Sequence, residues 1–142
     1  MIIYAKPEDF DWIYPLYSKN TQYLGPPIPA AIRQSLADNN VLTNDERTGF
    51  CIFHIAKTKG HISVSTICVD EKSRRQHLGK QFIDFLKENY TYSIRSVCIS
   101  NTSSERFWAS VSEKIGTKYS RKGTELSIYE INRDKFVKEK LF

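Results

Sequence analysis

Hydrophobic residues recur along the chain with two different periods, and this difference separates predicted strands from predicted helices. Two long runs, Gly49–Lys57 and His61–Val69, are rich in the β-branched and aromatic residues that favour strands. The connection Thr58-Lys59-Gly60 is short and contains a glycine, so the two runs are predicted to form an antiparallel hairpin. Shorter strands are predicted at Ile2–Ala5, Val41–Thr43, Ser93–Ile99, Thr117–Ser120 and Glu125–Ile131.

Apolar residues spaced three and four apart predict four helices between these strands. Thr102-Ser103-Ser104-Glu105 has the form of a capping box and opens the last helix, which Gly116 is expected to close. The resulting order is a mixed α/β (α+β) chain, which we expect to form a single domain over residues 1–142. The predicted helices are a first one after Pro7 with Phe10, Ile13, Tyr14 and Tyr17, a second at Ala30–Asp38, a third with Leu78, Phe82, Phe85 and Leu86 up to Asn89, and a fourth with Phe107, Val111 and Ile115.

Composition narrows the classes of protein. A chain of 142 residues with 40% hydrophobic residues can bury one core. It holds no run near the roughly 18 apolar residues that a membrane span needs, and its first residues lack the layout of a signal peptide. We therefore expect a cytoplasmic protein with no membrane partner. Lys and Arg number 21 against 16 Asp and Glu, and the resulting charge of +5 favours anionic ligands.

Cysteine and histidine usage argues against a metal site. The three cysteines, Cys51, Cys68 and Cys98, are far apart in apolar, β-branched runs, which is typical of reduced thiols packed in strands. The three histidines, among which His54 is expected to lie in the core, show no spacing that would hold a metal.

The most informative segment is Ile67–Lys80, where a hydrophobic strand is followed by a basic turn that opens an amphipathic helix. A helix N-terminus presents unpaired backbone N–H groups and the positive end of the helix dipole. Nearby arginine and lysine side chains strengthen the positive field. The residues alone predict a site for phosphate or carboxylate, with a plain solvated connection as the alternative.

This segment resembles the signature of the GNAT acyltransferases, Val-Asp-x-x-x-Arg-x-x-Gly-x-Gly. Val69, Asp70, Arg74 and Gly79 are in register with it, and His77 stands where the first glycine is usual. The resemblance continues from the first strand to Asn101-x-x-Ser104-x-x-Phe107-Trp108, so it covers about Ile2 to Ile131. It implies a mostly antiparallel sheet of six to seven strands flanked by about four helices.

The same resemblance implies a co-substrate, acetyl-CoA or another acyl-CoA, and an amine acceptor. The turn would hold the phosphates, the strand would pair its backbone with the pantetheine arm, Asn101 would bond that arm, and Phe107 would pack beneath it. The implied cofactor-binding residues are Ile67, Cys68, Val69, Arg74, Arg75, Gln76, His77, Leu78, Gly79, Lys80, Asn101 and Phe107.

The catalytic groups depart from the family pattern. Trp108 stands where the family often has an acidic tyrosine, and an indole cannot donate a proton in that way. No carboxylate lies between Gly60 and Asp70, so His61 is the candidate general base, with a strand-end surface residue as the alternative. No cysteine has a motif that pairs it with a base, which favours direct attack by the amine on the thioester.

The sequence predicts an N-acyltransferase and leaves two other functions open. One is a GNAT fold that binds a ligand or partner without chemistry, which the residues His77 and Trp108 suggest. The other is a protein that binds or modifies nucleic acid, which the net charge of +5 suggests. The acceptor and the oligomeric state are also open, with a homodimer among the options because the C-terminal hairpin leaves strand edges.

Overall fold

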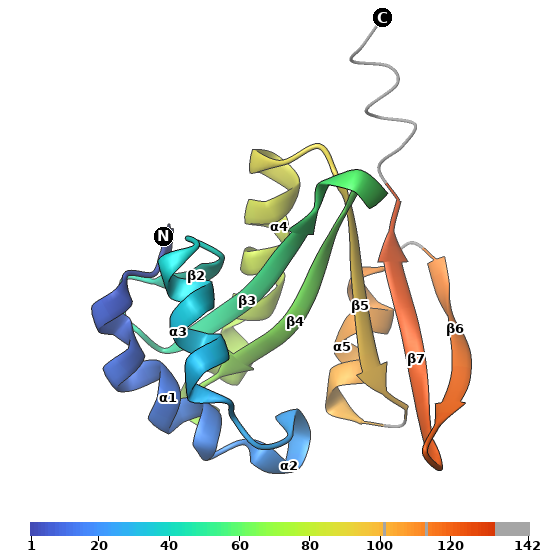
Figure 1. The fold of residues 1–142 in the computed structure, drawn as a ribbon, viewed down its shortest axis with the longest axis horizontal. Coiled ribbons are helices and arrows are strands. Elements are labelled where there is room, and N and C mark those ends of the chain that lie inside the picture. Colours follow the sequence, from blue (N-terminus) through green and yellow to red (C-terminus); the bar gives the residue numbers. More distant parts are fainter. Residues whose placement is uncertain (101, 113, 133–142) are drawn as a thin grey trace, which may run out of the picture. The chain divides into compact units, whose positions relative to one another are not determined.

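The computed structural model describes residues 1–100, 102–112 and 114–132, and the side chains at 22–23, 75–76 and 114–118 lie outside this description. Within these residues, seven strands form a sheet with the order β1-β2-β3-β4-β5-β7-β6 (Figure 1). β4 pairs with β5 in parallel at His61–Ser63, while β1–β2, β2–β3, β5–β7 and β6–β7 pair antiparallel. The predicted α/β class and mostly antiparallel sheet are confirmed. The strands are β1 (Ile2–Tyr4), β2 (Val41–Asn44), β3 (Gly49–Ala56), β4 (His61–Val69), β5 (Ser93–Ile99), β6 (Lys114–Arg121) and β7 (Thr124–Ile131).

Four helices of nine residues or more occur in the described part of the chain, as predicted. None of the described helices is long and apolar enough to cross a membrane. The long helices are α1 (Phe10–Ser18), α3 (Pro29–Ala37), α4 (Leu78–Asn89) and α5 (Ser103–Val111); α2 (Thr21–Leu24) is a single turn, and η1 (Pro7–Asp9), η2 (Lys57–Lys59) and η3 (Glu71–Gln76) are 3-10 helices.

Residue contacts divide the chain into two compact units. Unit 1 comprises Met1–Phe53 and Ser65–Leu86, and unit 2 comprises His54–Val64 and Lys87–Phe142. Strands β3 and β4 each contribute residues to both units. The expectation of a single domain stays a prediction.

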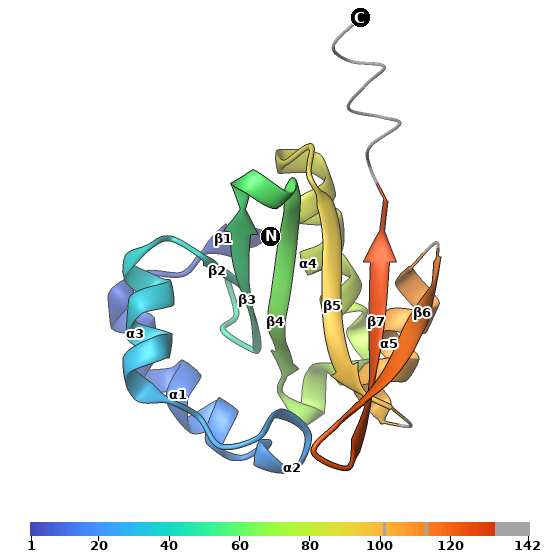
Figure 2. The ribbon, with the colours of Figure 1, turned by 45° about the vertical axis from the view of Figure 1, so that its right-hand side comes forward.

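Unit 1 is built from two layers of helix around its strands. Helices α1 and α3 lie on one face of the strands and α4 lies on the other (Figure 2). The apolar faces predicted from helical spacing are buried, with Ile13, Ile32 and Leu36 packed against Phe50 and Ile52. On α4, the residues with an exposed fraction of 5% or less are Leu78, Phe82, Ile83 and Leu86.

Unit 2 packs α5 against β5 and β7. The buried residues of this unit include small polar side chains, and these are hydrogen-bonded. The hydroxyl of Ser96 donates to the carbonyl of Val64 at 3.1 Å, and the hydroxyls of Ser100 and Ser127 lie 2.6 Å apart. Strands β6 and β7 are joined by a tight turn in which Lys122 and Gly123 both have positive φ, at 52° and 82°. This is the conformation that matches the twist of a hairpin.

The end of α5 differs from the sequence prediction. The helix ends at Val111 instead of continuing past Ile115 to Gly116, and β6 begins at Lys114. Ser112 has extended backbone angles, while its N–H and its hydroxyl both donate to the carbonyl of Trp108. Pairing of Lys114 with Glu130 and of Thr117 with Ile128 in the β6–β7 ladder replaces the helical bonds that local spacing predicted. The predicted charged tail at residues 133–142 lies outside the described residues.

Asp9 organises the start of α1. Its carboxylate accepts hydrogen bonds from the backbone N–H of Lys6 at 2.8 Å and the indole N–H of Trp12 at 2.7 Å. Arg47 Nε lies 3.6 Å from the same carboxylate, whose residue is 7% exposed. The aspartate therefore satisfies two donors at the point where the chain leaves β1 and enters the helical layer.

Asp9→Ala is expected to lower the free energy of unfolding by about 1–3 kcal/mol, because it leaves two partly buried donors without their acceptor. Urea denaturation followed by circular dichroism would measure the change. Asp11→Ala is the matched control, since Asp11 is exposed on the same helix, and it should change the stability far less. Equal losses in the two variants would contradict a bonding role for Asp9.

Candidate functional site

The predicted strand, basic turn and helix are confirmed, and the segment from Ile67 to Lys80 that joins them lies in unit 1. Strand β4 ends at Val69, and the backbone of Asp70 is bonded on both sides. Its N–H donates to the carbonyl of Thr48 at 2.7 Å, and its carbonyl accepts from the N–H of Ser73 at 2.8 Å. Ser73 is 7% exposed, so the 3-10 helix η3 is held against the unit at its centre.

His77 occupies the position where the family signature has its first glycine, and it adopts the left-handed conformation, with φ 58° and ψ 25°. A glycine reaches this region without steric cost, whereas a residue with a Cβ atom pays roughly 1–2 kcal/mol. The carbonyl of His77 accepts from the N–H of Gln81 at 3.1 Å, so His77 caps the start of α4. Its side chain is exposed. The turn therefore keeps a glycine-like backbone path although it carries a histidine.

The first turn of helix α4 follows His77 directly. With His77 as the cap, the N–H groups of Leu78, Gly79 and Lys80 belong to the first turn, where a helix supplies no acceptor of its own. Leu78 is buried at 5% exposure and anchors this turn, while Lys80 is exposed. The predicted side chains of Arg75 and Gln76 lie outside the described residues. The first turn of a helix offers backbone N–H groups and the positive end of the helix dipole, an arrangement that suits an oxyanion.

Arg74 forms two hydrogen bonds that were not predicted from the sequence. Its Nε donates to the carbonyl of Val69 at 3.1 Å, and its Nη2 donates to Oδ1 of Asn20 at 2.6 Å. Asn20, which is 7% exposed, in turn donates through Nδ2 to the carbonyl of Leu16 at 2.8 Å. Arg74 therefore ties the end of β4 to the end of α1. Arg74 and Asn20 are 54 residues apart, and no local pattern links them.

The predicted strand residues have different exposures. Ile67 and Val69 are half-buried, while Cys68 is 4% exposed. Burial raises the pKa of Cys68 to about 11, although nearby Arg74 acts in the opposite direction. Burial likewise raises the pKa of Cys98 to about 11 and that of Cys51 well above its usual range. All three thiols are free and lie in strands, as predicted, and they stay protonated near neutral pH.

Helix α5 in unit 2 carries the other predicted positions. Its capping is confirmed, since the N–H of Glu105 donates to the hydroxyl of Thr102 at 3.2 Å. Phe107 is half-buried, and its ring meets that of Trp108 edge to face at 5.4 Å. Trp108 is 3% exposed and serves as a core residue. The predicted Asn101 lies outside the described residues.

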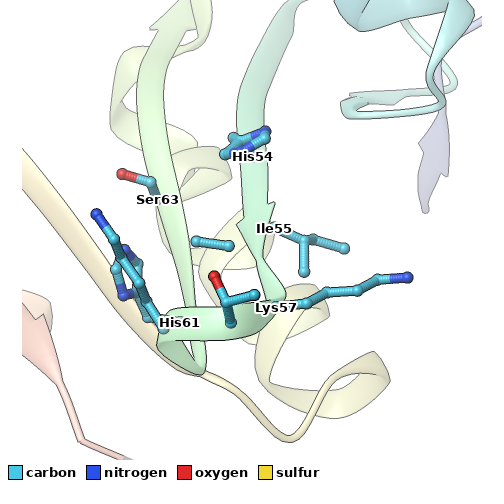
Figure 3. Close-up of a pocket in the computed structure, with 8 residues that line it drawn as sticks. His54, Ile55, Lys57, His61 and Ser63 are labelled. Carbon is cyan, nitrogen blue, oxygen red and sulfur yellow. The ribbon is translucent and has the colours of Figure 1, made fainter.

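The candidate base His61 lines an open pocket in unit 2. The pocket has a volume of about 560 Å³ and lies at the end of the β3–β4 hairpin (Figure 3). His61 is half-buried, and it lies on the same side of β4 as Ser63, whereas Ile55 and Lys57 are directed away on the other side of the hairpin. His54 also lines the pocket and is exposed, so the prediction that it lies in the core is wrong. Residues 49–53 of β3 are all buried and His54 is the first exposed residue of the strand, a change that its apolar sequence does not reveal.

Comparisons with known proteins support the fold. The sequence matches no protein-family model, and the search of curated proteins found no match. Solved structures do match. The ribosomal-protein-S18-alanine N-acetyltransferase from Escherichia coli is 16% identical with a TM-score of 0.68, covering 94% of this chain and 93% of that chain.

Two further matches extend this result. The loading GNATL domain of CurA from Lyngbya majuscula is 10% identical with a TM-score of 0.75, covering 95% of this chain and 98% of that domain. Rv2747 from Mycobacterium tuberculosis, in complex with CoA and NLQ, is 10% identical with a TM-score of 0.67, covering 91% of this chain and 98% of that chain. At these identities the likeness shows the fold: the chain has the GNAT fold that its motifs predicted.

The left-handed conformation at residue 77 makes a prediction about stability. His77→Gly should raise the free energy of unfolding by about 0.5–1 kcal/mol, because the steric cost of φ 58° exceeds the added flexibility of glycine in the unfolded chain. His77→Ala keeps the Cβ atom and should give no gain. Thermal unfolding of the two variants would test this, and an alanine variant as stable as the glycine variant would contradict it.

Proposed function

We propose that this protein is an N-acyltransferase that uses acyl-CoA, with acetyl-CoA as the first candidate. The observation that carries the proposal is the turn at His77 to Lys80, where a residue in the left-handed conformation leads into the first turn of α4. Such a turn suits a pyrophosphate, since it offers multiple donors and the positive end of a helix dipole. Similarity to an N-acetyltransferase and to a CoA-bound protein of the same fold supports this reading.

The residues of the turn fit the phosphates of CoA. The amides of Leu78, Gly79 and Lys80 would bind them, and the ammonium group of Lys80 would add charge. Arg74 would act by holding the end of β4 in place, since two of its nitrogens are already bonded to Val69 and Asn20. Acyl-CoA would supply the acyl group in activated form, as a thioester. The roles implied along the rest of the acyl-CoA molecule stay predictions; they belong to Ile67, Cys68, Val69, Asn101 and Phe107.

Direct transfer to the amine fits the chemistry of the described thiols better than a covalent acyl-enzyme does. A thiolate is the nucleophile in such an intermediate, and all three cysteines are buried with raised pKa values. The acid that protonates the leaving thiolate is not Trp108, because that residue is buried and its indole has no acidic proton in this range. Solvent or a group of the acceptor would serve in its place.

The base is constrained by the length of β4. The sequence predicts His61 for this role and a thioester beside Val69. β4 is nine residues long and has these two residues at its ends. A strand rises about 3.3 Å per residue, so eight steps correspond to about 26 Å, far beyond hydrogen-bond reach. A base at His61 therefore could not reach an amine that attacks a thioester beside Val69. We expect His61→Gln to leave turnover nearly unchanged if the thioester lies beside Val69.

A second candidate function is a GNAT fold that binds acyl-CoA or a related ligand without transferring the acyl group. Trp108 favours it, because a buried indole occupies the position where the family often has an acid. This candidate predicts binding at the turn with no acetylated product from any amine. The acceptor class, nucleic acid included, stays a prediction.

Calorimetric titration of acetyl-CoA into the protein is the experiment that tests the proposed function. We expect saturable binding to the parent protein and its loss in Gly79→Glu, because the new carboxylate would stand in the phosphate turn. A glutamate near a helix N-terminus is favourable to the helix, so the variant should still fold, as circular dichroism would check.

Ala31→Glu provides the matched control for this titration. It adds the same charge at an exposed position in the first turn of α3, also in unit 1. The control should bind acetyl-CoA like the parent protein. If neither acetyl-CoA nor a longer acyl-CoA binds the parent protein, the proposed function is wrong.

A further inference from the structure

The pocket at the end of the β3–β4 hairpin is separate from the turn assigned to acyl-CoA, and it belongs to unit 2 alone. Eight residues line it, and most of them carry polar or charged groups. No aspartate or glutamate is among these lining residues. They are His54, Ile55, Ala56, Lys57, Thr58, Lys59, His61 and Ser63.

The lining groups are hydrogen-bond donors of the kind that bind oxyanions. Lys57 and Lys59 are positively charged, and His54 and His61 can each donate from a ring nitrogen. Ser63 and Thr58 add hydroxyl groups. Charge-assisted hydrogen bonds to an oxyanion are about twice as strong as neutral ones. In Figure 3, His61 and Ser63 lie on one side of the hairpin, so they can contact a single ligand there.

Strand β5 adds a further positively charged residue, Arg95, next to the pocket. Ser63 is the register partner of Arg95 in the parallel β4–β5 pair, and the two side chains therefore project to the same side. The Nε–H of Arg95 is buried and has no hydrogen-bond acceptor among the described residues. It forms an ion pair with Glu130, whose Oε1 lies 3.8 Å from Nε, beyond hydrogen-bond distance. A cationic side chain with an unused donor thus stands beside the pocket wall.

We propose that this pocket binds a phosphate group carried by a small molecule. The charge of the site favours an anion, since the lining includes Lys59 and no carboxylate, and Arg95 is the register partner of Ser63. A volume of about 560 Å³ falls in the range of small-molecule sites and exceeds the needs of one free phosphate ion. Ala56 offers apolar contact to the organic part of the ligand. This inference does not rest on the proposed function.

The three histidines of the chain make the proposal testable, because two of them line the pocket and the third, His77, stands in the acyl-CoA turn. Proton NMR of the imidazole resonances would follow titrations with inorganic phosphate and with glycerol 3-phosphate at constant ionic strength. We expect saturable shifts of the His54 and His61 resonances, with tighter binding of the ester. Equal affinities would assign the site to free phosphate and overturn the small-molecule part of the proposal.

Variants distinguish binding in the pocket from non-specific attraction of phosphate to positive surface charge. Lys59→Gln and His61→Gln should each weaken binding about tenfold, the effect of losing one charge-assisted hydrogen bond. Lys19→Gln, which removes the same charge from an exposed position at the end of α1, should not change it. Equal weakening in all three variants, or shifts confined to His77, would overturn the proposal.

The Gly79→Glu variant separates phosphate binding in the pocket from acetyl-CoA binding at the turn. It should remove the response of acetyl-CoA at His77 and leave the phosphate response of His54 and His61 intact. Loss of the His54 and His61 response in this variant would place the phosphate in the acyl-CoA turn and contradict a separate site.

Discussion

The basic turn depends on the guanidinium group of Arg74, which bridges two distant segments of unit 1. One end of the bridge is the carbonyl of Val69, the last residue of β4, and the other is the buried side chain of Asn20 after α1. A planar group with several fixed donors suits this double contact, which a lysine would not reproduce. The direction in which the chain leaves β4, and hence the direction of the amides that follow, rests on this bridge.

His77 gives the turn the left-handed backbone that a glycine would adopt without steric cost. His77 takes on the steric cost of a left-handed backbone, and its side chain is exposed. The backbone of the turn thus follows the path expected for the first glycine of the family signature, but with a steric cost that glycine would avoid.

Much of the fold could be predicted from residue patterns, because those patterns agree with the tertiary structure. β4 and β5 have the predicted bounds, His61–Val69 and Ser93–Ile99, since alternation of buried and exposed residues persists along both. The end of α5 could not be predicted, because pairing of β6 with β7 overrides helical spacing. The same holds for the Arg74–Asn20 bond, which joins residues 54 positions apart. Of the candidate site, the turn was predictable and its internal bonding was not.

The proposed function depends on the amides of Leu78, Gly79 and Lys80 binding the pyrophosphate of CoA. Backbone amide NMR of the protein, before and after addition of CoA, tests this directly. The account predicts that the largest amide shifts occur at residues 77–80, as new hydrogen bonds form there. Saturating CoA that shifts other amides and leaves these unchanged would contradict it.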